Sequence, residues 1–193
     1  VKYKGKIILG GLFKINDARN IVFYDGSSWI PLSEEVPSMG SIEELVVYND
    51  ILYIGGWMTE SPTGAPASYL IAWDGEKYFK PFPTVNFSKK VDELEVLNNK
   101  LYISGTFHFG QDTNNYATAQ FDGENFCAFG GSYHTSPSSA TRQLRIVNNE
   151  LYATTGIIHF GDSMNNIAKW IGTEMDSCIY SPIVSGMNEL SVN

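Results

Sequence analysis

Charge is scarce in this chain, and most of it is negative. Asp, Glu, Lys and Arg make up 18% of the 193 residues, and the formal net charge is −8. The longest basic run is the pair Lys89-Lys90. Because nucleic acids and anionic membrane surfaces are bound by clustered Lys and Arg, this balance argues against both as main partners.

Long hydrophobic runs are absent as well. No stretch approaches the roughly eighteen apolar residues that cross a bilayer, so we expect no membrane insertion. The sequence begins at Val1 without a signal-peptide pattern, which favours a mature, processed or excised piece of a longer protein. No serine, cysteine or threonine lies in a nucleophile motif.

Glycine and tyrosine are abundant by contrast, and three sequence patterns each occur four times. The first reads KIILGG, ILYIGG, KLYISG and ELYATTG, and its leading apolar residues Ile7, Leu52, Leu101 and Leu151 recur after 45, 49 and 50 residues. A later pattern reads YDGSSW, WDGEKY, FDGENF and WIGTEM. The third precedes the first and reads EELVV, DELEV, RQLRIV and NELSV. Three patterns that keep one period indicate an internal repeat.

Each repeat divides into four short strand-like segments. The ELxV pattern predicts a first strand that ends at Asn49-Asp50, Asn98-Asn99 or Asn148-Asn149, residues that suit two-residue hairpins. The LYIGG pattern predicts the second strand. An Asp-Gly turn separates the third strand from a fourth that starts at an aromatic residue, with Met175 in that place in the last repeat.

Four antiparallel strands per unit of nearly fifty residues are typical of a propeller blade. The sequence therefore predicts an all-β fold, a β-propeller with four blades of four antiparallel strands. The blades span approximately residues 1–40, 41–89, 90–140 and 141–186, and residues 187–193 start a further first strand. Two arrangements stay open: the termini together close a four-bladed ring, or the blades are a slice of a larger propeller. We favour the slice.

The motifs LYxGGxF and NIAxWDGxxW resemble those of kelch-like and galactose-oxidase-central-domain-like propellers in secreted and cell-surface proteins of bacteria. The resemblance rests on Leu52–Gly56, on Ile71–Gly75 and on their equivalents, and it covers essentially the whole chain. The last repeat departs from it, because Ile171 replaces the turn aspartate. The resemblance implies a propeller fold and an extracellular or cell-surface location, and it carries over no catalytic residue.

The only two cysteines are predicted on outer strands of neighbouring blades. Such strands usually lie well apart, beyond the reach of a disulfide. We therefore expect Cys127 and Cys178 to be unpaired, although the sequence alone leaves their pairing open.

Matched polar loops of the third and fourth blades form a first candidate site. One contains His108 and Asn115, and the other contains His159 and Asn166 at equivalent places. Neighbouring blades should present both on one face, which Trp57 of the second blade also reaches. Imidazole, amide and indole groups can bind a sugar or a peptide. The alternative is that these residues cap their own turns, and we expect no metal here because a third ligand is missing.

A column of acidic residues forms a second candidate site. Glu44, Glu93 and Glu189, with Gln143 in the fourth place, each precede the leucine of a first strand, near the predicted mouth of a central channel. Converging carboxylates repel one another unless they are hydrated, protonated or bridged by a cation. We expect a wet, acidic mouth and no cofactor, with a calcium or sodium ion as the alternative. The aspartates of the Asp-Gly turns are interpreted as structural.

Together these observations favour a non-catalytic, extracellular binding or scaffolding module that presents a face to a protein or glycan ligand. Two alternatives stay open. One is a carbohydrate-active hydrolase or lyase that uses acidic and histidine residues of the loop face, since paired carboxylates need not be close in sequence. The other is an architectural spacer in a large surface protein. Further blades or domains of a longer parent chain are also expected partners.

Overall fold

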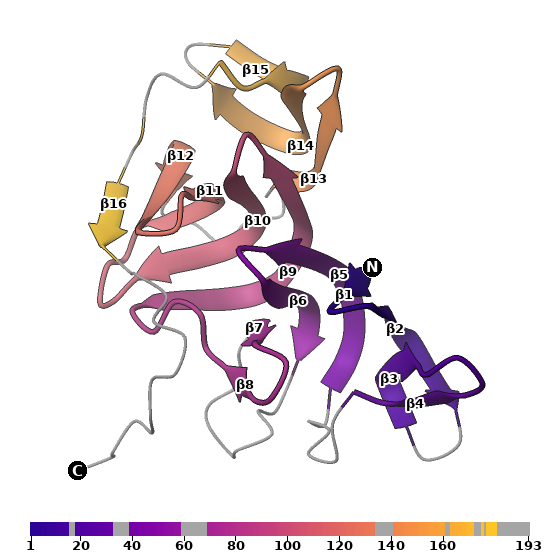
Figure 1. Cartoon of the computed structure of the whole chain (residues 1–193). Helices are drawn as coiled ribbons and strands as arrows, with labels where there is room; N and C mark the ends of the chain where they lie inside the picture. The colour runs from indigo at the N-terminus through magenta and orange to yellow at the C-terminus, as the bar shows by residue number, and fades with distance from the viewer. Residues whose placement is uncertain are drawn as a thin grey trace.

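The described part of the chain is built from β-strands in four antiparallel sheets, which confirms the predicted all-β class (Figure 1). The computed structural model describes residues 1–15, 18–32, 39–58, 69–133, 141–160, 163–171, 175 and 177–180. Within these ranges, no helix is long and apolar enough to cross a membrane.

The sheets follow one another in chain order, and we number them I to IV. Sheet I contains β1 (Lys2–Tyr3), β2 (Lys6–Ile15), β3 (Ala18–Tyr24) and β4 (Trp29–Pro31). Sheet II contains β5 (Met39–Tyr48), β6 (Ile51–Met58), β7 (Leu70–Trp73) and β8 (Tyr78–Phe79). Sheet III contains β9 (Val85–Leu97), β10 (Lys100–Phe109), β11 (Asn115–Phe121) and β12 (Asn125–Tyr133), and sheet IV contains β13 (Thr141–Val147), β14 (Glu150–Phe160) and β15 (Ser163–Lys169).

The turn between the first and second strands is the same in all four sheets. It is formed by Lys4-Gly5, Asn49-Asp50, Asn98-Asn99 and Asn148-Asn149, and both residues of each pair have positive φ, between 44° and 80°. Two successive left-handed residues define the hairpin turn whose twist matches that of the flanking strands. The prediction that Asn and Asp form these turns is confirmed.

The Asp-Gly turns between the third and fourth strands also share one geometry. In each, the aspartate Oδ1 accepts two backbone N–H groups, for example those of Ser27 at 2.8 Å and Ser28 at 2.7 Å on Asp25. Asp74 and Asp122 accept the equivalent pairs. These bonds lower the pKa of the exposed Asp25 carboxyl. The structural interpretation of the repeated aspartates is confirmed.

The fourth strand of the last repeat lies outside sheet IV. β16 (Ser177–Tyr180) pairs with β12, so among the described residues sheet III has five strands and sheet IV has three. The turn before β16 has Ile171 where the other repeats have a capping aspartate. The free edge of β12 is also nine residues long, whereas β4 and β8 have three and two residues. A long free edge readily pairs with another strand. The prediction of four strands in every unit is therefore wrong for the last two units.

The two cysteines form a disulfide, against the expectation from the sequence. Cys127 on β12 lies directly opposite Cys178 on β16. The expectation assumed that outer strands of neighbouring units stay apart, and the pairing of β16 with β12 removes that separation. The predicted further strand at residues 187–193 lies outside the described residues.

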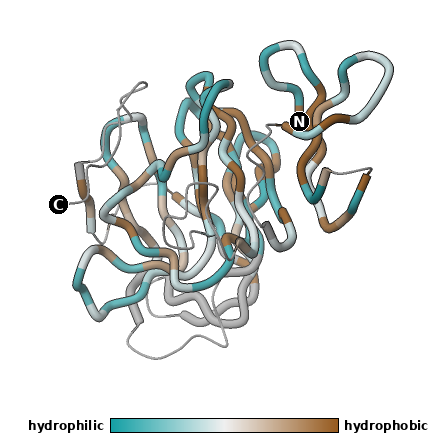
Figure 2. Tube along the Cα trace, turned by 90° about the horizontal axis from the view of Figure 1, so that it is seen from below, coloured by the Kyte–Doolittle hydropathy of each residue, from teal (hydrophilic) through white to brown (hydrophobic). Residues whose placement is uncertain are grey.

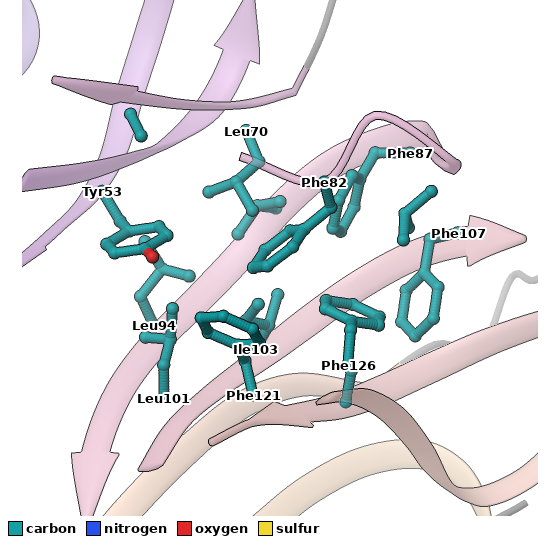
Figure 3. Packing of buried hydrophobic residues seen from close by; sticks show 14 of the residues in the cluster. Tyr53, Leu70, Phe82, Phe87, Leu94, Leu101, Ile103, Phe107, Phe121 and Phe126 are labelled. Carbon is teal, nitrogen blue, oxygen red and sulfur yellow. The ribbon is translucent and has the colours of Figure 1, made fainter. Parts of the chain in front are cut away.

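The sheets stack face to face, each on the next. β2 and β3 contact β5; β5, β6 and β7 contact β9; and β13 contacts both β9 and β10. One apolar cluster fills each of the three interfaces. The middle cluster is rich in aromatic rings, and Figure 3 shows Phe82 and Phe121 between Tyr53 on one side and Phe126 and Phe107 on the other.

The second strand of each inner sheet contributes side chains to the interfaces with both neighbouring sheets. In β6, Leu52 and Ile54 pack toward sheet I, whereas Tyr53 between them packs toward sheet III. β10 repeats this arrangement, with Leu101 toward sheet II and Tyr102 toward sheet IV. Successive residues of a strand point to opposite faces, so the LYI pattern provides apolar side chains to both interfaces.

The first glycine of the repeated Gly-Gly pair is required by this stacking. A Cβ at Gly10 would lie 2.6 Å from the Ile42 side chain of sheet II, and one at Gly55 would lie 2.8 Å from that of Val91 in sheet III. The first strand of the next sheet therefore packs directly against the glycine backbone.

One tyrosine in each of the first two sheets also connects that sheet to the next one. The Tyr3 hydroxyl lies 3.0 Å from the carbonyl of Asp50, and the Tyr48 hydroxyl donates to the carbonyl of Asn99 at 3.0 Å. Both acceptors are second residues of the hairpin turn in the following sheet. Burial is the main cause of the raised pKa of both phenols, which reaches about 12 for Tyr3.

We expect Tyr48→Phe to lower the free energy of unfolding by about 1 kcal/mol, because a carbonyl at the interface loses its donor. Urea denaturation measures this change. Tyr24→Phe is the matched control, since its hydroxyl bonds to Gly26 within an exposed turn of its own sheet. Equal losses in the two variants would contradict a specific role of the Tyr48 hydroxyl between sheets.

We expect replacement of both Cys127 and Cys178 by serine to lower the free energy of unfolding by about 2–4 kcal/mol, because the disulfide closes a long loop. Reduction of the unmodified protein should shift the denaturation curve to the same position. Two free thiols titrated in the native, unreduced protein would show that the pairing of β16 with β12 is wrong.

Candidate functional site

The first strands of the inner sheets bring acidic residues together. Glu44 on β5 and Glu93 on β9 occupy the same place in their repeats, each one residue before the leucine of the strand. Each faces a small residue on the neighbouring strand, Gly55 for Glu44 and Ser104 for Glu93. The two carboxyl groups lie within hydrogen-bonding reach of each other, an arrangement that favours the protonated form of Glu44. The convergence predicted for this column is therefore present for these two residues.

Arg145 on β13 supplies the positive charge of this cluster. Its guanidinium forms an ion pair with Glu93 and lies 3.6 Å from a carboxylate oxygen of Glu95. Glu93 is only 3% exposed, so the expected wet acidic mouth is wrong at this position. A buried carboxylate needs a charged partner and hydrogen bonds, and Arg145 meets both needs.

The environment of Glu44 favours its protonated form. Burial is the main cause, with further contributions from the hydrogen bond to Glu93 and its negative charge, and together they raise the pKa of Glu44 to about 7. Burial likewise raises the pKa of Glu95. The hydrogen bond to Glu93 raises the pKa of Arg145, so its positive charge is firmly held.

This cluster is poorly arranged for acid–base chemistry on a substrate. Glycoside hydrolysis needs two carboxyl groups roughly 5–10 Å apart with a sugar between them. Glu44 and Glu93 instead bond directly to each other, and Glu93 is buried. The cluster joins strands of sheets II, III and IV by charge and hydrogen bonds, and we interpret it as part of the framework.

An exposed aromatic platform lies at the end of β6. Trp57 is 49% exposed, and the ring of Tyr69 meets its indole edge-on at a centroid distance of 5.9 Å. Gly40 runs beneath it, since a Cβ there would lie 2.1 Å from the Trp57 carbonyl oxygen and 3.0 Å from indole Cδ1. Two neighbours therefore fix the indole while half of its surface remains open to solvent.

The polar loop residues are only partly placed. His108 lies near the end of β10 and is half-buried, and its Nδ1 has no hydrogen-bond partner within the described residues. Asn115 begins β11, where it pairs with Tyr133. The side chains of His159 and Asn166 and the whole of Glu189 lie outside the described residues. The convergence of the two histidines thus stays a prediction.

No group of three or more His, Cys, Asp or Glu side chains in the described ranges is arranged to hold a metal ion. In the described part of the chain, Arg145 is the cation that contacts the acidic column. A calcium or sodium ion at the channel mouth therefore stays a prediction.

Sequence reasoning named Trp57, but it missed Arg145 and the contacts of Trp57 with Tyr69 and Gly40. Arg145 takes the place that Glu95 has in the preceding repeat, and this reversal of charge at one position of the repeat was the available signal. Gly40 lies on β5 and Tyr69 directly precedes β7, and nothing in their spacing from Trp57 indicated the contact. A cavity of about 360 Å³ between turns of sheets I, II and III, lined by Lys4, Asp50 and Gly123 among others, was missed for the same reason.

No family model matches the chain, and no curated protein matches it significantly.

We expect the free energy of unfolding to fall as the pH rises from about 5 to above 7. The raised pKa of Glu44 means that the folded state binds the extra proton below pH 7 and loses this stabilisation as Glu44 ionises. Because Glu44 is partly exposed, the slope should stay below the limit of about 1.4 kcal/mol per pH unit for one proton.

Glu44→Gln should flatten this dependence and make the protein more stable than the parent at pH 8, since an amide still donates to Glu93 without ionising. Denaturation curves of both proteins at several pH values measure the free energy of unfolding and its pH dependence. Glu43→Gln is the control, because Glu43 is a neighbouring acid in a peripheral pair with Lys90 at 3.9 Å. An unchanged pH profile in Glu44→Gln would contradict this assignment.

Proposed function

We propose that the four sheets are consecutive blades of a β-propeller. The sheets stack in chain order, and the hairpin turn between the first two strands recurs in all four with one backbone geometry. The side chains of Glu44, Glu93 and Arg145, all on first strands, meet at one place. Both features are expected where the innermost strands of adjacent blades surround a common axis.

We propose further that this protein is a non-catalytic binding or scaffolding module that presents a protein- or glycan-binding face. The observation that carries this proposal is the Trp57 platform. A rigidly held, half-exposed indole is suited to stack on the apolar face of a sugar ring or on a peptide side chain, and its fixed position lowers the entropic cost of binding. His108 and Asn115, on the adjoining sheet, add polar groups at strand ends.

The character of the acidic cluster supports a non-catalytic role. Glu93 is buried and paired with Arg145, and Glu44 is hydrogen-bonded to Glu93. The titratable residues of this cluster are thus engaged with one another within the protein. A hydrolase or lyase would need other acids, and turnover of a glycan by the pure protein, abolished by a single loop substitution, would favour that alternative.

An extracellular or cell-surface location is proposed from two observations. The disulfide between Cys127 and Cys178 is a bond that persists in oxidising compartments. The resemblance of the repeat to kelch-like propellers of secreted proteins points the same way. The net charge of −8 gives no support to a nucleic-acid partner.

We expect Trp57→Ala to weaken glycan or peptide binding by about tenfold or more, in the range found for aromatic residues central to an interface. A glycan and peptide array identifies the ligand, and titration of the ligand measures its affinity for each variant. Trp29→Ala is the matched control, because Trp29 packs against Tyr24 next to an Asp-Gly turn, away from the loops after the second strand. Equal losses in both variants, or binding unaffected by Trp57→Ala, would overturn the assignment of this surface.

A further inference from the structure

The last repeat differs from the other three in the place where its fourth strand pairs. β4, β8 and β12 each pair with the third strand of their own sheet. β16 instead pairs with β12 of sheet III, and Figure 1 shows it beside β12 and away from β15. Among the described residues, no strand pairs with the outer edge of β15. The structure therefore offers β16 two sheet edges, one occupied and one free.

The residues on either side of the last turn keep the place that the repeat gives them. In the first three repeats, an aromatic residue that ends the third strand pairs with one five positions later, as Phe121 pairs with Phe126. The equivalent residues of the last repeat, Trp170 and Met175, both pack against the apolar cluster between sheets III and IV. Phe126 likewise packs in the interface between its own sheet and the preceding one. The fourth strand of the last repeat thus diverges from the others beyond Met175.

The turn before β16 lacks the bonds that direct the fourth strand in the other repeats. There an aspartate accepts two backbone N–H groups, as Asp122 does from Glu124 and Asn125. The last repeat has Ile171 in that place, 75% exposed, although the turns that join the strands are mostly hydrophilic (Figure 2). Because isoleucine accepts no such bonds, this turn does not commit the strand that follows to one edge.

The disulfide is the main restraint on the place of β16. Cys127 and Cys178 lie directly opposite each other within a pairing that includes only Asn125–Ala128 and Ser177–Tyr180. Ile179 adds an apolar contact with the cluster between sheets II and III. So short a pairing at the edge of a sheet contributes little stability by itself, and the covalent bond therefore decides where the strand lies.

We propose that β16 is a redox-controlled strand, which the disulfide holds on β12 and which moves on reduction to the free edge of β15, where it completes sheet IV. A dithiol supplies the two electrons. One of its thiolates attacks the sulfur of the exposed Cys178 and displaces the thiolate of Cys127, which is 6% exposed. The second sulfur of the dithiol then displaces Cys178. The protein gains two thiols with the two protons of the dithiol, and the dithiol becomes a cyclic disulfide.

The register of sheet III defines the pairing expected after reduction. Thr118 of its third strand pairs with Phe129 of its fourth, and the equivalent residues of the last repeat are Ile167 and Cys178. β16 cannot pair with β12 and β15 at once, so each position of the strand covers one edge and opens the other. The redox state of the two cysteines therefore decides which sheet edge is open to pairing with another strand.

Residue-resolved amide hydrogen exchange of the whole chain, with and without a dithiol, tests the change of partner. We expect reduction to abolish the protection of the β12 amides that face β16 and to protect β15 amides that exchange freely in the oxidised protein. The variant with both Cys127→Ser and Cys178→Ser should show the reduced pattern without any dithiol. Addition of dithiol to this variant is the matched control and should change nothing.

A second experiment tests the register in the Cys127→Ser background, which leaves Cys178 as the native thiol. Ile167→Cys places a thiol opposite Cys178 in the proposed pairing, whereas Lys169→Cys places one two residues along the same face of β15. Both side chains are exposed, so the fold should be retained, which circular dichroism checks. On oxidation, the first variant should form an internal disulfide much faster than the second, because diagonal neighbours lie about 7–8 Å apart, too far for this bond. Mass spectrometry of the peptides identifies the bond.

Two results would overturn the proposal. The first is protection of the β12 amides that persists after reduction, or β15 amides that stay unprotected, because β16 then does not change its partner. The second is absent or equal cross-linking in Ile167→Cys and Lys169→Cys, because the released strand then has no defined place on β15.

Discussion

Sheets II and III are apolar on both faces, and the rest of the structure depends on covering these faces. The alternation in β6 and β10, where leucine and isoleucine point one way and tyrosine the other, forces every inner sheet to lie between two neighbours. Gly10 and Gly55 allow the next sheet to approach the backbone, and the hydroxyls of Tyr3 and Tyr48 fix its hairpin turn. A stacked row of sheets follows from these few positions of the repeat.

The stacking also decides where charge is buried and where it is exposed. Because first strands of adjacent sheets converge, the acidic column of the repeat is brought together, and it is tolerable only because the fourth sheet contributes Arg145. Burial of Glu44 beside the carboxyl group of Glu93 keeps Glu44 partly protonated near neutral pH. The ends of the second strands lie outside the stack, and Trp57 can remain half-exposed there on its support of Tyr69 and Gly40.

Local features of this fold were predictable from the sequence, and features that depend on tertiary contacts were not. The Asn-Asp, Asn-Asn and Asp-Gly turns follow from residues that accept left-handed backbone or cap their own turn, so their positions were predicted correctly. The pairing of β16 with β12, and with it the disulfide, depends on competition between two sheet edges. The role of Arg145 depends on which strands meet across the interior. The acidic column itself could be read from the repeat, but the raised pKa of Glu44 beside Glu93 could not.

Residue-resolved amide hydrogen exchange tests most directly whether covered faces hold this structure together. The second strands β2, β6 and β10 have similar lengths and the same place in their sheets, but only β6 and β10 lie in sheets with both faces covered. Coverage by two neighbours predicts markedly slower exchange in β6 and β10 than in the central amides of β2. Protection of β2 equal to that of β6 and β10 would contradict this account.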